Sequence, residues 1–307
     1  MFRTALLAAS RSGAIRGLVE RTPLTRPVVK RFISGDDVDA AIATTGEVLA
    51  DGRYVTLDHL GEDTRDARQA DGTVEAYLEL LRRLADAGYA DRAEVSVKLS
   101  AVGQFLPVDG EKIALENARR ISAAAGAVGT TVTLDMEDHT TTDSTLGILR
   151  ELRVDFPWVG AVLQAYLKRT EQDCRDLAHA GSRVRLCKGA YKEPATVAFQ
   201  DKAEVDRSYV RCLKVLMAGE GYPMIASHDP RLIAIGHELA SSRDADTYEF
   251  QMLYGIRPDE QRRIAAAGNR MRVYVPYGDQ WYGYFMRRLA ERPANVAFFL
   301  RSLITKG

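Results

Sequence analysis

An apolar, β-branched run followed by an amphipathic helical stretch recurs eight times between residues 53 and 291, and this repeat constrains the fold most strongly. The apolar runs lie at 54–57, 94–99, 131–136, 159–165, 184–187, 223–227, 247–253 and 272–275. The helical stretches lie at 72–87, 112–128, 144–154, 171–180, 195–218, 231–241, 258–267 and 280–291. Eight such units in about 250 residues predict an α/β protein with a parallel (βα)8 TIM-type barrel. A doubly wound sheet shares the alternation, but it usually has fewer strands and a glycine-rich first turn that is missing here.

The segment before the first run does not join the alternation. We therefore expect an N-terminal helical arm at 1–52 and a catalytic barrel domain at 53–307, closed by a last helix at 293–304. The first 33 residues contain seven lysines and arginines and one acid. That composition fits a helical arm packed on the domain, an arm that touches an anionic membrane, or a mitochondrial targeting peptide. The packed arm is our expectation, and peripheral membrane contact stays open.

Charge and cysteine content exclude several classes of protein. The chain has 42 basic and 42 acidic residues, so no overall field points to nucleic acid as a partner. No apolar run approaches the roughly 18 residues of a membrane-spanning helix. Three scattered cysteines without a CxxC pair argue against a disulfide framework or a zinc site and favour a reducing compartment. We expect a cytoplasmic protein without a metal.

Almost every apolar run ends in residues that can bind or titrate. Because TIM-barrel active sites lie at the carboxyl ends of the strands, these residues should surround one site. They are Asp58, His59, Lys98, Asp135, Glu137, Asp138, Gln164, Arg185, Lys188, His228, Glu249, Gln251 and Tyr274. Any one of them alone could be a rim salt bridge, so their joint position is the informative fact.

Two lysines and one histidine among them allow several kinds of chemistry. Lys98 lies inside an apolar strand and needs a charge partner, for which Asp135 in the next repeat is the natural choice. A structural ion pair, a carboxylate-binding cation and a Schiff-base lysine all stay open for Lys98. Lys188 is followed by Gly189, which would let a ligand approach the backbone closely. His228 could act as a general base, donate to a ligand oxygen or cap the next helix.

The stretch from 271 to 291 combines a short strand with an aromatic, cationic helix. Tyr284, Arg287, Arg288 and Glu291 recur at i, i+3, i+4 and i+7, which places them on one helix face. Two adjacent guanidiniums suit a bound carboxylate. A solvated face with an internal Arg–Glu pair is the alternative. The six aromatic residues between 274 and 285 favour a binding face.

Seven segments, in this order along the chain, resemble proline dehydrogenase, most closely its single-function bacterial form. They are SVKLSA at 96–101, TLDMED at 133–138, LQAYLKR at 163–169, RLCKGAYKEP at 185–194, ASHDP at 226–230, YEFQMLYG at 248–255 and RVYVPYG with YFMRRLAE within 272–291. The resemblance implies a distorted (βα)8 barrel with noncovalent FAD. It also implies oxidation of L-proline to Δ1-pyrroline-5-carboxylate by hydride transfer to the flavin, with electrons passed to a membrane quinone. Pyrroline-5-carboxylate dehydrogenase is a candidate partner for the product.

The resemblance also implies residue roles. Lys98, Arg287 and Arg288 would bind the proline carboxylate. Tyr274, Tyr284 and Leu253 would shape the pocket. Asp135 would hold Lys98, and Glu291 would hold the arginine pair. The implied flavin contacts are Gln164, Arg185, Lys188, Gly189, Ala190, Tyr191, Ser227, His228, Glu249 and Gln251. Two departures put local FAD contacts in doubt: Ser227 stands where many members have threonine, and Lys192 stands where the long bifunctional members have tryptophan.

Three other functions stay open on the residues. Methylenetetrahydrofolate reductase is another flavin barrel, but it would need a folate site and a reduced nicotinamide. A Schiff-base aldolase would use Lys98 or Lys188, and borohydride trapping without bound flavin would support it. A flavin- or metabolite-binding regulator would bind proline without reducing the flavin.

Overall fold

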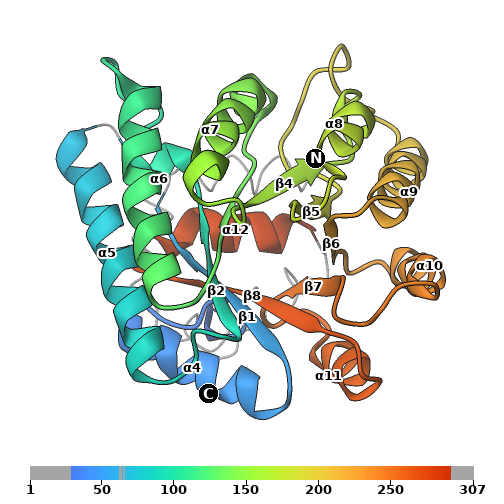
Figure 1. The fold of residues 1–307 in the computed structure, drawn as a ribbon, viewed down its shortest axis with the longest axis horizontal. Coiled ribbons are helices and arrows are strands. Elements are labelled where there is room, and N and C mark those ends of the chain that lie inside the picture. The colour runs from blue at the N-terminus through green and yellow to red at the C-terminus, as the bar shows by residue number, and fades with distance from the viewer. Residues whose placement is uncertain (1–28, 62–63, 65, 292–307) are drawn as a thin grey trace, which may run out of the picture.

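Eight parallel strands close into a barrel in the computed structural model, which describes residues 29–61, 64 and 66–291, without the side chains of 287–291 (Figure 1). The strands follow chain order, and β1 pairs with β8 to close the ring. They are β1 Tyr54–His59, β2 Ala93–Val97, β3 Val132–Leu134, β4 Gly160–Gln164, β5 Arg183–Cys187, β6 Tyr222–Ala226, β7 Glu249–Leu253 and β8 Met271–Tyr277. The predicted (βα)8 barrel is confirmed.

Helices follow the strands as the repeat predicts. They are α4 Val38–Ala50, α5 Ala67–Asp86, α6 Gly110–Ala127, α7 Thr142–Asp155, α8 Thr170–Leu177, α9 Lys202–Ala218, α10 Pro230–Ala240, α11 Pro258–Ala266 and α12 Trp281–Glu291, with 3-10 turns η2 Leu99–Val102 and η3 His139–Thr141. The predicted helix 195–218 is wrong at its start, because Asp201 caps α9 by accepting from the backbone N–H of Glu204. The predicted helix 293–304 lies outside the described residues. Within the described part of the chain, the helices are too short or too polar to cross a membrane.

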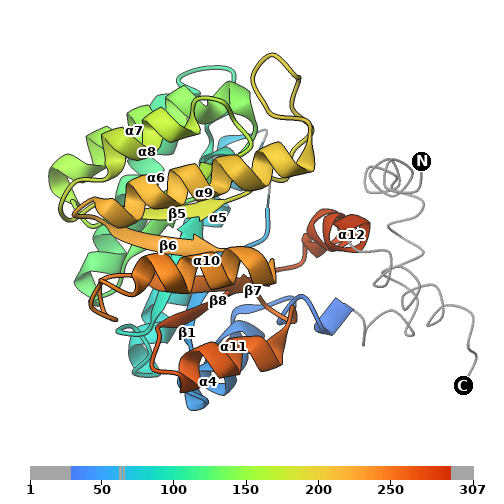
Figure 2. The same cartoon turned by 90° about the vertical axis from the view of Figure 1, so that its right-hand side faces the viewer.

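The helix after β8 leaves the outer ring. α12 lies beyond the end of the barrel to which β8 leads, away from the other helices (Figure 2). Its aromatic residues, among them Trp281 and Phe285, pack in a small cluster with Phe32, Ile33 and Leu60. α4 instead packs against β1, β8 and α5. The segment predicted as an arm therefore contributes a helix to the layer around the barrel, and its boundary at residue 52 stays a prediction.

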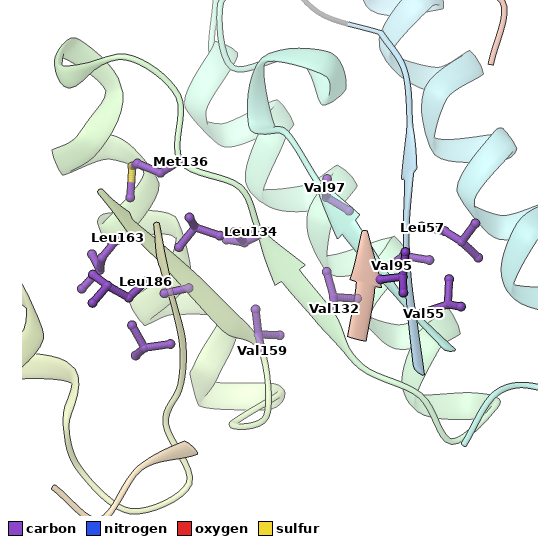
Figure 3. Close-up of a cluster of buried hydrophobic side chains, with 14 of the residues drawn as sticks. Val55, Leu57, Val95, Val97, Val132, Leu134, Met136, Val159, Leu163 and Leu186 are labelled. Carbon is purple, nitrogen blue, oxygen red and sulfur yellow. The ribbon is translucent and has the colours of Figure 1, made fainter. Parts of the chain in front are cut away.

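The hydrophobic core lies between the strands and the surrounding helices (Figure 3). Alternate strand residues point to opposite faces. The apolar ones include Val55, Leu57, Val95, Val97, Val132, Leu134, Leu163 and Leu186, all buried. The other set lines the barrel interior and is largely polar. The ion pair between Glu94 on β2 and Arg183 on β5 shows this. The two side chains are 2.6 Å apart, and because β2 and β5 are not neighbouring strands, the pair must lie inside the barrel.

Glu94 is the centre of this interior network. Its carboxylate accepts from Thr56 at 2.8 Å and Arg183 at 2.6 Å, with Arg272 at 3.8 Å. Burial alone would raise the pKa of Glu94, but the surrounding guanidiniums outweigh burial and lower the pKa below its ordinary value. Arg272 in turn contacts Glu249 at 2.8 Å. Paired ions therefore fill the interior below the strand ends, where many such barrels have apolar layers.

Candidate active site

A cavity of about 690 Å³ opens at the carboxyl ends of the strands. This volume lies within the range of small-molecule sites, about 300–1,000 Å³. Most residues predicted for the site line it: Lys98, Asp135, Gln164, Arg185, Lys188, Gly189, Ala190, Tyr191, Ser227, His228, Gln251, Leu253, Tyr274 and Tyr284. They converge because each strand contributes its last inward-facing positions to the same end of the barrel.

Lys98 forms its closest ion pair with Asp58, whereas Asp135 is the partner predicted from the sequence. The Lys98 Nζ atom lies 2.6 Å and 2.7 Å from the two carboxylate oxygens of Asp58, but 3.7 Å from Asp135. Both members of the pair are buried. Burial raises the pKa of Asp58 to about 6, against the attraction of Lys98. Asp135 is thus a second ion-pair partner of Lys98, Asp58 is the nearer one, and both carboxylates line the cavity.

Asp135 is the acceptor for a second cluster. The Tyr274 hydroxyl donates to it at 2.7 Å, Arg185 Nη1 at 2.8 Å and Ser96 Oγ at 2.8 Å. Burial and the nearby carboxylates of Asp135 and Asp58 raise the pKa of Tyr274 well above its ordinary value. The phenol is therefore a donor, and it is not a base near neutral pH.

Arg185 lines the cavity, and only one of its three guanidinium nitrogens forms a hydrogen bond among the described residues. Its guanidinium lies 5.3 Å from the centre of the Tyr274 ring, and its Nη1 atom bonds Asp135 and Ser96. Its Nε and Nη2 atoms have no hydrogen-bond partner among the described residues, and Nη2 is 3.6 Å from Glu94. Both atoms are buried, and Arg185 as a residue lines the cavity.

Two glutamine amides are fixed by bonds to their neighbours. Gln164 Nε2 donates to the carbonyl of Glu137 at 2.6 Å, and Gln251 Nε2 donates to Glu249 at 2.5 Å. Both glutamines line the cavity. Glu249 does not line it, because the side chain is fully buried between Gln251 and Arg272. The predicted flavin contact of Glu249 is therefore corrected to a role behind Gln251.

Lys188 lies on the rim between two carboxylates. Its Nζ atom contacts Asp206 and lies 3.1 Å from Asp229. Asp229 also caps α10, and the hydrogen bond from Arg231 is the first cause of its lowered pKa. Sequence reasoning missed Lys202 and Arg231 as lining residues, since they belong to helix starts and not to strand ends.

His228 uses one ring nitrogen as an acceptor. The backbone N–H of Leu253 donates to its Nε2 atom at 2.9 Å. This bond assigns the ring proton to Nδ1, so the ring is a donor there. Of the roles considered for His228, the structure disfavours the general base, because the lone pair that would take a proton is already engaged.

Gly189 is required by packing behind the loop. Its φ of +107° lies in the left-handed region, and an added Cβ would overlap the ring of Tyr166. Gly189 also lines the cavity, so the expected close approach of a ligand to its backbone stays a prediction.

α12 covers one side of the cavity. Tyr284 lines it, and helical spacing places positions 287, 288 and 291 on the same face of α12. The side chains of Arg287, Arg288 and Glu291 lie outside the described residues, so the predicted carboxylate clamp stays a prediction. Within the described residues, no cluster of three histidine, cysteine or acidic side chains could hold a metal.

The chain matches known proteins over most of its length. A family described as Proline dehydrogenase matches residues 41–301. Proline dehydrogenase 1 of Bacillus subtilis is 39% identical over 284 residues, which cover 92% of each chain. Proline dehydrogenase of Deinococcus radiodurans is 39% identical over 308 residues, which cover 99% of this chain and 98% of the relative. The solved structure of proline utilization A (PutA) from Bdellovibrio bacteriovorus inactivated by N-propargylglycine has a TM-score of 0.81 and 26% identity. That match covers 97% of this chain and 37% of the longer protein.

Proposed function

The chain belongs to the proline dehydrogenase family and is an oxidoreductase of proline catabolism; on that premise we propose that it oxidises L-proline to Δ1-pyrroline-5-carboxylate with noncovalent FAD. The observation that carries the proposal is the cavity of about 690 Å³, with Arg185 donors at its wall and buried Lys98 beside them. Bound FAD would supply the acceptor for the hydride that leaves proline.

The cavity residues fit a flavin. Flavin rings present several acceptor atoms, and the guanidinium of Arg185, which lines the cavity, would donate to them. Gln164, Gln251 and the Nδ1–H of His228 would bind further polar atoms of the cofactor, and Lys188 would face its anionic part. Gly189, Ala190, Tyr191 and Ser227 would complete the contact surface on the loops after β5 and β6.

Lys98 would bind the substrate carboxylate together with the guanidiniums of Arg287 and Arg288. Asp58 would keep the Lys98 ammonium in place, at 2.6 Å. Tyr274, Tyr284 and Leu253 would form walls that exclude water and orient the ring. Glu291, one turn beyond Arg287 and Arg288 on α12, would hold the arginine pair.

The amine of proline must be neutral when hydride leaves. Because the neutral fraction rises with pH, kcat/KM should rise with pH until another group titrates. Tyr274 would be a donor throughout, since burial and two carboxylates raise its pKa.

A Schiff-base aldolase is less well supported. Such chemistry needs a neutral, accessible amine. Lys98 lies between Asp58 and Asp135, and Lys188 lies between Asp206 and Asp229. Each nitrogen is engaged by two carboxylates, so neither amine is available to attack a carbonyl carbon.

Two further steps belong to the proposal. Electrons would leave through a quinone at the membrane, which requires peripheral contact of the protein with that surface. The product would pass to pyrroline-5-carboxylate dehydrogenase.

The test is a turnover assay on the purified chain. With L-proline and an artificial electron acceptor, the acceptor should be reduced, and o-aminobenzaldehyde should trap a product that D-proline does not yield. Replacing the artificial acceptor with a quinone in vesicles should sustain turnover. A protein with bound flavin that forms no trapped product would contradict the proposed substrate.

A further inference from the structure

The β5–α9 loop, residues 188–201, forms one side of the cavity. Its first four residues, Lys188 to Tyr191, are consecutive lining residues. The loop contains no regular element before α9, so something else must fix its shape. Backbone bonds fix its first residue and its second half, where the carbonyl of Pro194 accepts from Val197 N and Ala198 N at 3.1 Å. Tyr166 N donates to the carbonyl of Lys188 at 2.8 Å, and Lys168 N donates to that of Val197 at 2.9 Å.

Glu193 lies in the middle of this loop and is buried, although Lys192 and Pro194 on either side are exposed. A buried carboxylate between two exposed residues is unusual and needs partners. Its partners come from two other strand–helix connections. The backbone N–H of His139 donates to it at 3.0 Å, the His139 ring contacts it, and the Tyr166 hydroxyl donates at 3.2 Å.

Tyr166 joins the two parts of the loop. Its ring packs against Gly189, where a side chain would overlap it. Its hydroxyl bonds Glu193 and also the backbone of Tyr191. Burial and Glu193 raise the pKa of Tyr166, so the phenol is a donor to the carboxylate. Glu193 and Tyr166 thus contact the loop on both sides of the residues that face the cavity.

We propose that Glu193 is a positioning residue: through Tyr166 and His139 it fixes the loop 188–201 so that Lys188, Ala190 and Tyr191 present one surface to the cofactor. The role in cofactor binding rests on the proposed function, because FAD is the ligand that this surface would contact. The fixing of the loop itself rests only on the contacts of Glu193.

The test compares Glu193→Ala with Glu260→Ala in the full chain. Glu260 is another glutamate with a bonded partner, Arg263 at 2.7 Å, but it lies on α11 and does not line the cavity. Glu193→Ala should weaken FAD binding about tenfold, the change that about 1.4 kcal/mol produces. It should also speed hydrogen exchange of the amides at 189–193. Glu260→Ala should change neither quantity.

Two milder variants guard against a protein that fails to fold. Glu193→Gln removes only the charge, and Tyr166→Phe removes only the hydroxyl, and each should shift FAD binding and loop exchange in the same direction. When Glu193→Gln and Tyr166→Phe are combined, the loss of FAD affinity should be smaller than the sum of the two single losses, because both residues act through the same hydrogen bond. Unchanged exchange and unchanged FAD affinity in Glu193→Ala and Glu193→Gln would overturn the inference. A wild-type protein that binds no flavin would contradict the proposed function instead, and loop exchange would still test the role of Glu193.

Discussion

Lys98 and Asp58 form a buried charge pair that borders the cavity, with the ammonium 2.6 Å from the carboxylate. A buried pair of this kind does little for stability while it is intact, but removal of one member leaves the other charge uncompensated. The same ammonium lines the cavity, and we propose that it binds the substrate carboxylate. Variants at Lys98 should therefore affect both binding and stability.

We expect Lys98→Ala to raise the KM for proline at least tenfold and to lower the free energy of unfolding by about 3 kcal/mol. The first effect comes from the lost carboxylate partner and the second from unpaired Asp58. Steady-state kinetics and urea unfolding measure them, with exposed Lys112→Ala as the control. An unchanged KM would leave Lys98 as a structural partner of Asp58 only.

The pH dependence of stability tests the environment of Asp58. Burial raises its pKa from 3.8 to about 6, so the folded state binds this proton more tightly than the unfolded state does. The stabilisation from this group is complete below about pH 3.8 and is lost as pH rises through about 6. The unfolding free energy of the wild type minus that of Asp58→Asn should therefore fall between pH 4 and pH 6. A difference that rises across this interval would contradict the assignment.

Arg288→Ala tests the predicted clamp on α12. Loss of one guanidinium from a carboxylate site should weaken proline binding by about 2–4 kcal/mol. Saturable proline oxidation should disappear while flavin stays bound. Arg263→Ala, on exposed α11, is the control. Normal proline kinetics in Arg288→Ala would remove Arg288 from the site.

Lys98 also illustrates what sequence can and cannot predict about single residues. An ammonium inside an apolar strand requires an acid, and that need was predicted correctly. The predicted acid, Asp135, is an ion-pair partner at 3.7 Å, but the nearer partner, Asp58, was missed, because β2 has two neighbouring strands and an aspartate lies at the carboxyl end of each. The sequence indicates which strands are neighbours of β2. It does not give the side-chain directions that place Lys98 2.6 Å from Asp58 and 3.7 Å from Asp135.

The β5–α9 loop depends on its packing against the end of β4. Gly189→Ala should lower the free energy of unfolding by about 3 kcal/mol, from positive-φ strain and from overlap with Tyr166. It should also lower the flavin content of the purified protein. Gly181→Ala is a matched control, since its φ of +77° is also positive but its added Cβ would meet nothing within 4 Å. Equal losses in the two variants would show that backbone strain alone, and not Tyr166, governs position 189.

The boundaries of helices and strands were predicted well where apolar periodicity is strong. They were predicted poorly where an N-cap residue sets the start of a helix. The predicted strand at 184–187 differs by one residue from β5 at Arg183–Cys187. The predicted helix at 195–218 misses the start of α9 by seven residues, because Asp201 caps the helix and the residues before it pair with the β4 loop. The departure of α12 from the ring also escaped prediction, since its aromatic face fits either location.

The polar barrel interior should make the whole fold sensitive to Glu94. Glu94→Gln would leave Arg183, Arg185 and Arg272 undercompensated, and we expect a loss of about 3–5 kcal/mol in the free energy of unfolding. Glu171→Gln, in an exposed pair with Arg175, is the control. A loss below 1 kcal/mol in Glu94→Gln would show that the network does not support the barrel.

The carboxylate of Glu94 should also make the free energy of unfolding of the wild type fall in acid. Three arginines lower the pKa of Glu94 in the folded state, so its stabilisation is present above the ordinary value of 4.5 and is lost as pH falls below it. Glu94→Gln should lack this acid-induced loss in urea unfolding below pH 4.5. The eightfold repeat predicts the barrel, and the alternation of apolar and polar or charged residues within β2 and β5 is the sequence signal of its ionic interior.

The most direct test of the central claim is an anaerobic titration of the purified chain with L-proline, followed by absorbance. The account predicts an oxidised-flavin spectrum that bleaches on addition of L-proline and returns when a quinone is added. A flavin spectrum that L-proline leaves unchanged would retain the barrel and contradict the proposed substrate. A colourless protein that FAD cannot reconstitute would contradict the proposed function as a whole.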